Sequence, residues 1–437
     1  MTKVPGQQTL TIQQALDLGV SYHNAGRFAE AESVYQQLLQ ADPNQPVALR
    51  LLGTIAHQLG NSDAAVDLIT KAVAINPDDA EAHSNLGLAL RELGQLDAAV
   101  ASCRRALAII PDLAPAHFVM SVALLMQGKL QEGWQEYEWG LKVEQGKRAP
   151  NLPAKIWTGS PLQGKSIIVC GEQGVGDEIM FASCIDDLLE RSPDRLLLDC
   201  DLRLEALFAR SFPGVLVRGR AKGMDISWPS KQALPDYALP IGSLPKFFRN
   251  RVEDFPERQA YLTPHPQLVE KWMGRLSSLK SGLKIGISWR GGTEPNEIKR
   301  ASIALPEWRS LLSMDASFIN LQYGDVAEDI AAIDDLLLHD WPDNDPLADL
   351  DNQAALISCL DLVVTIDNAT VHLAGALGVR TWALIEQVPD WRWPEVFGDY
   401  PPLYRSVMLF RQKQMFEWGE VMERAAQALN DLMDNRS

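Results

Sequence analysis

The amino-acid sequence predicts a helical repeat region followed by an α/β region. In the first third of the 437 residues, small residues recur every 34 positions, which is typical of paired helices that repeat along a chain. Beyond residue 165, short β-rich runs alternate with helical ones. A chain of this length holds roughly two to four domains. We therefore expect repeats over 1–145, a linker over 146–164, and two α/β lobes over 165–275 and 276–437.

Glycine, alanine and proline mark the repeat. The recurring positions are Gly19, Gly53 and Gly87; Gly26, Gly60, Gly94 and Gly128; Ala31, Ala65 and Ala99; and Pro43, Pro77 and Pro111. Small residues let paired helices approach, and proline ends the second helix of each unit. This pattern resembles the tetratricopeptide repeat (TPR) and predicts an all-α TPR superhelix, with units at 12–45, 46–79 and 80–113. A fourth unit, 114–145, has Ser121 for the glycine and Gly133 for the alanine, as suits a terminal repeat.

Three polar residues of the repeats are candidates for a role. His83 and His117 occupy the same repeat position, and we interpret them as helix-packing residues. Asn85 is predicted on the concave side of its helix, where an amide can hydrogen-bond an extended peptide backbone. The alternative is a solvated polar residue.

The α/β region contains two series that each begin with a strand, a glycine-bearing turn and a helix. Strands are predicted at 166–170, 195–200, 283–289, 317–321, 361–366 and 381–385. Helices are predicted after Gly176, after Asn368 and over 416–433. Two such series predict two Rossmann-like lobes, whose ligands bind beyond the carboxyl ends of the strands and in the cleft between lobes.

Composition excludes several classes of protein. The net charge is 40 − 57 = −17, which argues against a nucleic-acid or anionic-membrane binder. The sequence has no apolar run long enough to span a membrane and no signal-peptide pattern at its start. Five separated cysteines and the absence of Cys/His clusters predict reduced thiols, a cytoplasmic protein and no protein-built metal site. Asp343 and Asp345 are interpreted as part of a turn.

Six segments spread over both lobes carry a further resemblance. They are GEQGVGDEIMFA (171–182), SWRGG (288–292), INLQYGD (319–325), DNATVHLAGALGV (367–379), PDWRW (389–393) and LFRQ (409–412). Through them, residues 165–437 resemble the ADP-heptose-type glycosyltransferases, the lipopolysaccharide heptosyltransferase family. They resemble more closely its bacterial members fused to TPRs, which include flagellin glycosyltransferases. The resemblance implies a GT-B fold, with an acceptor lobe at 165–275 and a nucleotide-sugar donor lobe at 276–437.

The glycine-rich turn carries the candidate base. Gly174 and Gly176 precede Asp177, and Gly176-Asp177 resembles the Gly-Asp pair whose aspartate is the family's expected catalytic base. An inverting transfer needs a carboxylate to take the proton of the acceptor hydroxyl. Asp177 also lies in the first turn of a predicted helix, so a capping role is the alternative. Glu172 is the second candidate carboxylate.

The donor phosphates are expected at the start of a helix. Asn368, Ala369 and Thr370 begin that helix, where backbone N–H groups and the helix dipole favour phosphate. The resemblance assigns this segment to phosphate binding, although the family often has a hydroxyl residue where this chain has Asn368. His372 lies one turn further and is either a ligand contact or a buried helix residue.

Other donor-lobe residues are candidates by their place in the family pattern. They are Arg290, Lys299 and Arg300 for phosphate, and Gln322 and Tyr323 for the nucleobase. Solvated side chains are the alternative for the three cations, and spacing does not choose between Lys299 and Arg300. The stretch 391–393 (Trp-Arg-Trp) is interpreted as a structural Trp–Arg stack rather than a lid on the sugar pocket.

The function predicted from these observations is transfer of a sugar from a nucleotide donor to serine or threonine hydroxyls of a protein. The TPR array is expected to capture that protein, and the resemblance favours flagellin. A helix N-terminus with Arg and Lys can replace a divalent cation, so no metal or other cofactor is expected. The alternatives are a lipopolysaccharide or glycan acceptor, and a non-catalytic TPR adaptor with a degenerate transferase region.

Overall fold

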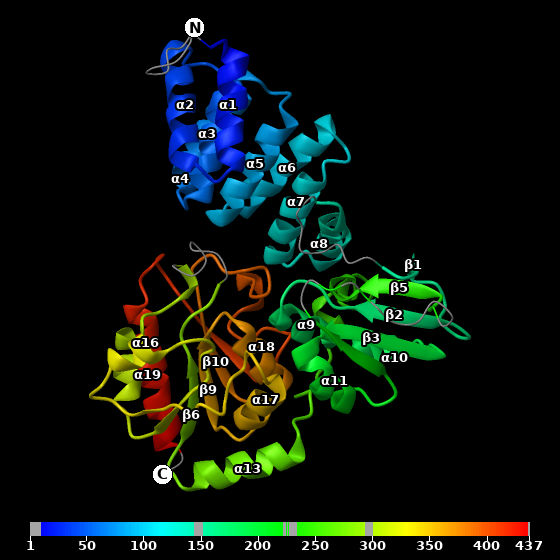
Figure 1. The fold of residues 1–437 in the computed structure, drawn as a ribbon, viewed down its shortest axis with the longest axis vertical. Helices are drawn as coiled ribbons and strands as arrows, with labels where there is room; N and C mark the ends of the chain where they lie inside the picture. The colour runs from blue at the N-terminus through cyan, green and yellow to red at the C-terminus, as the bar shows by residue number, and fades with distance from the viewer. Residues whose placement is uncertain are drawn as a thin grey trace. The chain divides into compact units, whose positions relative to one another are not determined.

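A computed structural model describes residues 10–143, 152–221, 224, 226, 234–292 and 300–435. The chain divides into two compact units (Figure 1). The first comprises Met1–Gln145 and Asp390–Arg392, and the second comprises Gly146–Pro389 and Trp393–Ser437.

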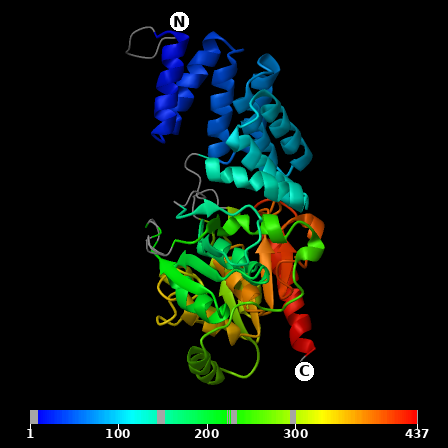
Figure 2. The same cartoon turned by 90° about the vertical axis from the view of Figure 1, so that its right-hand side faces the viewer.

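The first unit consists of helix pairs that repeat along the chain. The pairs are α1 (Ile12–Asn24) and α2 (Phe28–Ala41), α3 (Pro46–Gln58) and α4 (Ser62–Ile75), α5 (Ala80–Glu92) and α6 (Leu96–Ile109), and α7 (Ala114–Met126) and α8 (Leu130–Tyr137). The first helices of successive pairs begin 34 residues apart, which confirms the predicted repeat. Figure 2 shows the pairs stacked in chain order from blue to cyan. A short 3-10 helix, η1 (Glu138–Lys142), follows α8.

The recurring small residues act where the helices of a pair touch. A Cβ atom on Gly87 of α5 would lie 2.5 Å from Sγ of Cys103 in α6, so only glycine fits there. In the last pair Ser121 is fully buried at the equivalent position. There the close approach moves to Gly133 of α8, whose added Cβ would lie 2.7 Å from Cδ2 of Leu125. The departures of the fourth repeat therefore preserve close helix packing.

The first lobe of the second unit is built on a five-stranded parallel sheet in the order β1-β5-β2-β3-β4. Its elements are β1 (Lys155–Ile156), β2 (Ser166–Cys170), α9 (Val175–Ala182), α10 (Ile185–Leu189), β3 (Arg195–Asp201), η2 (Leu202–Leu204), α11 (Glu205–Ser211), β4 (Leu216–Arg220), β5 (Tyr237–Pro240), η4 (Ile241–Ser243), α12 (Pro245–Phe248) and η5 (Val252–Asp254). Central β2 is an apolar, buried run, as a strand covered on both faces requires. Part of the segment predicted as a linker supplies β1, which pairs with β5.

The second lobe is built on a six-stranded parallel sheet in the order β11-β10-β9-β6-β7-β8. Its elements are α13 (Pro266–Ser277), β6 (Lys284–Ser288), η6 (Leu305–Trp308), α15 (Arg309–Leu312), β7 (Ser317–Asn320), α16 (Ala327–Ala331), β8 (Leu338–His339), α17 (Leu350–Ser358), β9 (Leu362–Ile366), α18 (Ala369–Ala376), β10 (Thr381–Ile385), η7 (Glu395–Phe397), β11 (Val407–Arg411) and α19 (Gly419–Asp434). Each lobe thus has the parallel α/β architecture that the sequence predicts.

Candidate functional site

Helices α9 of the first lobe and α18 of the second lobe pack against each other at their first turns. A Cβ atom on Gly176 would lie 3.0 Å from Cδ2 of His372 and 3.3 Å from Cα of Ala369. The absence of a side chain at Gly176 therefore lets the glycine-rich turn of one lobe lie directly on the start of α18. This contact brings together two groups of residues that are about 190 positions apart in the sequence.

Asp177 lies at the third position of α9, directly after that contact. Its Oδ2 atom accepts a hydrogen bond from the Gly174 N–H at 3.0 Å, so Asp177 does cap its own helix. The side chain is half-buried rather than enclosed. Capping fixes the carboxylate at the place where the two lobes meet, so the capping role and a chemical role are compatible.

Two neighbouring carboxyl groups are buried in the framework. Glu172 is 6% exposed and accepts the Gly242 N–H at 3.0 Å. Glu178 is 6% exposed and accepts the Asp201 N–H at 2.8 Å, and burial raises its pKa to about 8. The first bond connects the glycine-rich turn to η4, which follows β5, and the second connects α9 to the end of β3. Of the three acidic residues, Asp177 is the one that the fold leaves partly exposed.

Asn368 connects the start of α18 to the turn after β6. Its Oδ1 atom accepts the Thr370 N–H at 2.9 Å, and its Nδ2 atom donates to Ser288 Oγ at 2.8 Å and to the Arg290 carbonyl at 3.1 Å. The amide predicted to contact phosphate is therefore used within the protein, as a helix cap and a brace. Among the described residues, we find no hydrogen bond from the N–H of Ala369.

Gln322, predicted to contact the nucleobase, has a comparable internal role. It is buried, and its Oε1 atom accepts from Ser288 Oγ at 3.0 Å and from the N–H groups of Trp289 and Arg290, each at 2.8 Å. Gln322 thus shapes the turn after β6. The next residue, Tyr323, is half-buried, and burial raises its pKa.

Arg290 and Arg300, the two candidate phosphate-binding cations among the described residues, both pair with oxygen atoms of the protein. The Nη1 atom of Arg290 lies 3.3 Å from Oδ2 of Asp329, and its Nη2 atom donates to the Asp325 carbonyl at 2.6 Å. Arg300 forms an ion pair with Glu386, which follows the carboxyl end of β10. Lys299 lies outside the described residues. A phosphate that used Arg290 or Arg300 would have to exchange with, or share, these partners.

His372 is a buried residue of α18 that is held on two sides. Its ring stacks on Trp393, with centroids 5.5 Å apart and an interplanar angle of 17°, and its Nδ1 atom lies 3.1 Å from the Tyr404 hydroxyl. In the same stretch, the Arg392 guanidinium lies over the Trp391 ring, 4.6 Å from its centroid. The Trp–Arg stack predicted at 391–393 is therefore present.

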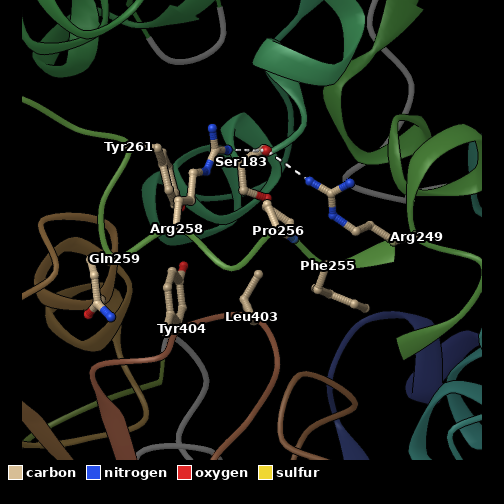
Figure 3. A pocket seen from close by; sticks show the side chains of 10 residues that line it. Ser183, Arg249, Phe255, Pro256, Arg258, Gln259, Tyr261, Leu403 and Tyr404 are labelled. Carbon is tan, nitrogen blue, oxygen red and sulfur yellow. Dashed lines mark hydrogen bonds between the residues drawn. The ribbon is translucent and has the colours of Figure 1, made fainter. Parts of the chain in front are cut away.

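A pocket at the C-terminal ends of α9 and α18 contains residues that the sequence did not single out (Figure 3). Its volume, counting the part that opens to solvent, is about 300 Å³. It is lined by Ser183, Arg249, Phe255, Pro256, Arg258, Gln259, Tyr261, Gly375, Leu403 and Tyr404. Arg249 and Arg258 both donate to the Ser183 carbonyl, so much of their hydrogen-bonding capacity serves the fold. Most of these residues belong to the segment 249–261 or to the loop before β11, where no sequence pattern marks them, whereas Ser183 caps the end of α9 and Gly375 lies in α18.

In the repeat unit, Asn85 donates from Nδ2 to Thr54 Oγ1 at 3.0 Å, which bridges α5 to α3. His83 and His117 each contact the carbonyl of the preceding repeat-ending proline, at 3.0 Å and 2.9 Å.

Within the described residues, no group of three or more His, Cys, Asp or Glu side chains is placed to hold a metal ion. No helix of that part of the chain is both long and apolar enough to cross a membrane.

Comparisons with known proteins agree with the first unit and extend into the second. Tetratricopeptide repeat models match residues 23–87 and 80–113. Protein FlbA of Caulobacter vibrioides is 36% identical over 322 residues, covering 70% of this chain and 53% of FlbA, so the chain spans about half the length of that relative. A match of that extent reaches beyond the repeats into the α/β lobes.

Two solved structures are similar to about a third of this chain. A crystal structure of MamA is 25% identical, covers 32% of this chain and 77% of MamA, and has a TM-score of 0.27. YrrB, described as a TPR protein with an unusual peptide-binding site, is 21% identical, covers 29% of this chain and 66% of YrrB, and has a TM-score of 0.26. From the repeat models and the FlbA match, the chain is a TPR protein related to FlbA, and its structure has two parallel α/β lobes.

Proposed function

We propose that this protein is a GT-B-type glycosyltransferase that moves a sugar from a nucleotide donor to serine or threonine hydroxyls of a protein acceptor. The observation that carries the proposal is the contact of Gly176 with the first turn of α18. It brings Asp177 in one lobe close to a helix N-terminus in the other. A partly exposed carboxylate beside a phosphate-binding helix start is the arrangement that glycosyl transfer needs.

The reaction follows from these two groups. The acceptor hydroxyl oxygen attacks the anomeric carbon, the bond from that carbon to the nucleotide phosphate breaks, and the hydroxyl proton passes to Asp177. The Gly174 N–H holds the carboxylate at 3.0 Å, so its position is fixed before the acceptor arrives. Position rather than an unusual basicity is what makes Asp177 the base in this proposal.

Charge that develops on the leaving phosphate is stabilised at the start of α18. Asn368 caps the Thr370 N–H, so the N–H of Ala369 is the first-turn donor that a phosphate would use. Arg290 and Arg300 supply positive charge once the phosphate competes with Asp329 and Glu386 for them. Lys299 is retained as a candidate on sequence grounds. With these donors no divalent cation is required.

The TPR array is proposed to present the protein acceptor, and the family resemblance makes flagellin the first candidate. Asn85 is proposed to contact an acceptor backbone. Asn85 donates to Thr54 in this structure, so a bound peptide would be recognised by the hydrogen-bonded side chains of Asn85 and Thr54 together.

The donor site can be tested by thermal unfolding against nucleotides and nucleotide sugars in EDTA. Ligand at about 100 times its Kd adds about 2.7 kcal/mol of stability, which raises the unfolding temperature measurably. A selective shift with one nucleotide would support a working, metal-independent site. Its sugar conjugates are then incubated with candidate acceptors, and the product is analysed for sugar on protein or on lipid.

The base is tested by Asp177→Asn. Asparagine can still accept the Gly174 N–H, so the cap and the unfolding temperature should be retained, while the transfer rate should fall on the order of 10²–10⁴-fold. Wild-type rates in a folded variant would remove Asp177 from the mechanism. No binding and no transfer with any donor would favour the adaptor function, and sugar on lipid alone would favour a glycan acceptor.

A further inference from the structure

Arg220, the last residue of the edge strand β4, reaches across the sheet of the first lobe to the glycine-rich turn. Its Nε atom lies 2.9 Å from Oδ2 of Asp199 in β3, and its Nη2 atom donates to the Gly171 carbonyl at 3.1 Å. Its Nη1 atom donates to the Met224 carbonyl at 2.8 Å. Because Gly171 directly follows β2, one guanidinium joins the carboxyl ends of three adjacent strands.

Gly171, the first residue of the turn, is held on three sides. Its carbonyl accepts from Arg220, and its N–H donates to the Asp199 carbonyl at 2.7 Å. On the third side lies Glu178 of α9, since a Cβ atom on Gly171 would come within 2.6 Å of Oε1 of Glu178. The other carboxyl oxygen of Glu178 accepts the Asp201 N–H at the end of β3. The turn therefore starts at a point fixed between the sheet and the first turn of α9.

This fixed point is close in the chain to both groups that define the position of Asp177. Asp177 directly precedes Glu178 in α9. The N–H group that holds the Asp177 carboxylate belongs to Gly174, three residues after Gly171. A displacement of Gly171 would therefore be passed on to the carboxylate and to the donor that fixes it.

A buried ion pair is a costly way to stabilise a sheet, because both charges lose water and apolar side chains of similar size are often as stable. Asp199 is fully buried beside Arg220. What apolar side chains cannot provide is a donor directed at the Gly171 carbonyl. The planar guanidinium presents separate N–H groups to a carboxylate and to a carbonyl, whereas a lysine ammonium is a single point charge. The arrangement therefore favours a role in fixing the turn.

We propose that Arg220, oriented by Asp199, is a positioning residue that fixes the glycine-rich turn and, through the turn, the carboxylate of Asp177. The role in catalysis rests on the proposed transferase function. Arg220 acts through the Gly171 carbonyl, not through the reacting atoms. An edge strand that the sequence pattern did not reveal thus supplies part of the support of the candidate site.

The brace can be measured without any turnover, by hydrogen exchange of the full-length protein with mass spectrometry of peptides from 166–178. Arg220→Lys keeps a cation beside Asp199 but cannot reach both acceptors in the same way. Loss of a hydrogen bond from a charged group should make local opening roughly 10-fold more frequent, so exchange in these peptides should be faster by about that factor. Peptides over β9 in the second lobe should keep their wild-type exchange.

Arg218→Lys is the matched control, because Arg218 is an exposed residue two positions earlier on the same strand, and exchange should not change. Unchanged exchange over 166–178 in folded Arg220→Lys would overturn the proposal, and so would equal acceleration in every part of the protein. Wild-type protein gives a result that needs no variant. If its glycine-rich turn exchanged as fast as an unstructured peptide, the brace would be refuted even if Arg220→Lys did not fold.

The catalytic consequence is measured as a split between kcat and KM. We expect kcat of Arg220→Lys to fall roughly 10-fold, because the base is misplaced, with little change in the donor KM, because the donor is proposed to bind at α18. Faster exchange with a wild-type kcat would show that Arg220 serves the fold alone and would overturn the positioning role. If the protein binds and turns over no donor, the transferase proposal fails, while the exchange data still decide whether Arg220 braces the turn.

Discussion

If the protein is the proposed transferase, replacing Gly176 by alanine should slow glycosyl transfer without unfolding the protein. Gly176 is the point at which the glycine-rich turn meets the start of α18. An alanine Cβ there would lie 3.0 Å from Cδ2 of His372 and 3.3 Å from Cα of Ala369. Both distances are tighter than an ordinary van der Waals contact of 3.4–4 Å, so a few tenths of an ångström must be gained somewhere.

The neighbours of Gly176 cannot easily supply that space. His372 is held by its stack on Trp393 and its bond to Tyr404, and Ala369 presents backbone. The first turns of α9 and α18 should therefore separate by a few tenths of an ångström. Because a 1 Å misplacement can cost about 10²-fold in rate, we expect a loss of roughly 3- to 10-fold. The helix propensity of alanine, better than glycine by up to about 1 kcal/mol, should offset most of the strain in stability.

The assay compares kcat and unfolding temperature of Gly176→Ala with those of Gly274→Ala. Gly274 lies inside α13, and a Cβ added there meets nothing within 4 Å. The control should therefore gain stability and keep its wild-type rate. A wild-type rate for Gly176→Ala, or an equal loss in Gly274→Ala, would refute the idea that close approach of α9 and α18 sets the reaction geometry.

Two further predictions concern stability. Asn368→Ala should lower the free energy of unfolding by about 1–3 kcal/mol in urea denaturation, because it removes a helix cap and two donated hydrogen bonds. Asn368→Asp keeps the cap and should therefore lower the free energy of unfolding by less. An equal loss in the two variants would contradict this account. The pKa of Glu178 is about 8 in the folded protein against its ordinary 4.5. Between these two values the folded protein retains a proton that the unfolded protein has lost. The contribution of Glu178 to the free energy of unfolding therefore declines as pH rises from 4.5 to 8, by up to about 1.4 kcal/mol per pH unit. Glu178→Gln should gain stability over wild type between pH 5 and 8 and show no further gain above it, whereas parallel pH profiles of the two proteins would contradict the burial argument.

Sequence patterns predicted the parts of the fold in which one physical requirement dominates. The repeat could be predicted because a glycine at each of the first three helix crossings, such as Gly87, and a proline at the end of each of the first three repeats recur at a fixed spacing. Strand β2 was readable because a central parallel strand is buried on both faces and thus apolar throughout. Strand β4 was missed because its residues are half-buried or exposed and include two arginines, as an edge strand permits.

The candidate site was predictable at the level of segments and less so at the level of side chains. The family pattern pointed to the glycine-rich turn and the α18 start as site segments, and the fold brings these two segments into contact. It did not indicate that the side-chain amides of Asn368 and Gln322 would form hydrogen bonds with the end of β6 and the turn after it. A sequence shows that a polar residue is present at a strand end, but only the packing of neighbouring turns shows which acceptors it meets.

The internal use of those amides has a consequence for recognition of the donor. Gln322 and Asn368 together bind the N–H groups and carbonyl of the turn after β6, so hydrogen bonds within the protein hold that turn before a ligand arrives. A helix start braced by this turn can offer preorganised donors to a phosphate, which every nucleotide sugar carries. Such donors do not distinguish one base or one sugar from another. Under the proposed function, selection among donors must therefore depend on contacts other than these, since Arg290 and Arg300, each paired with a carboxylate, are themselves proposed to meet the phosphate.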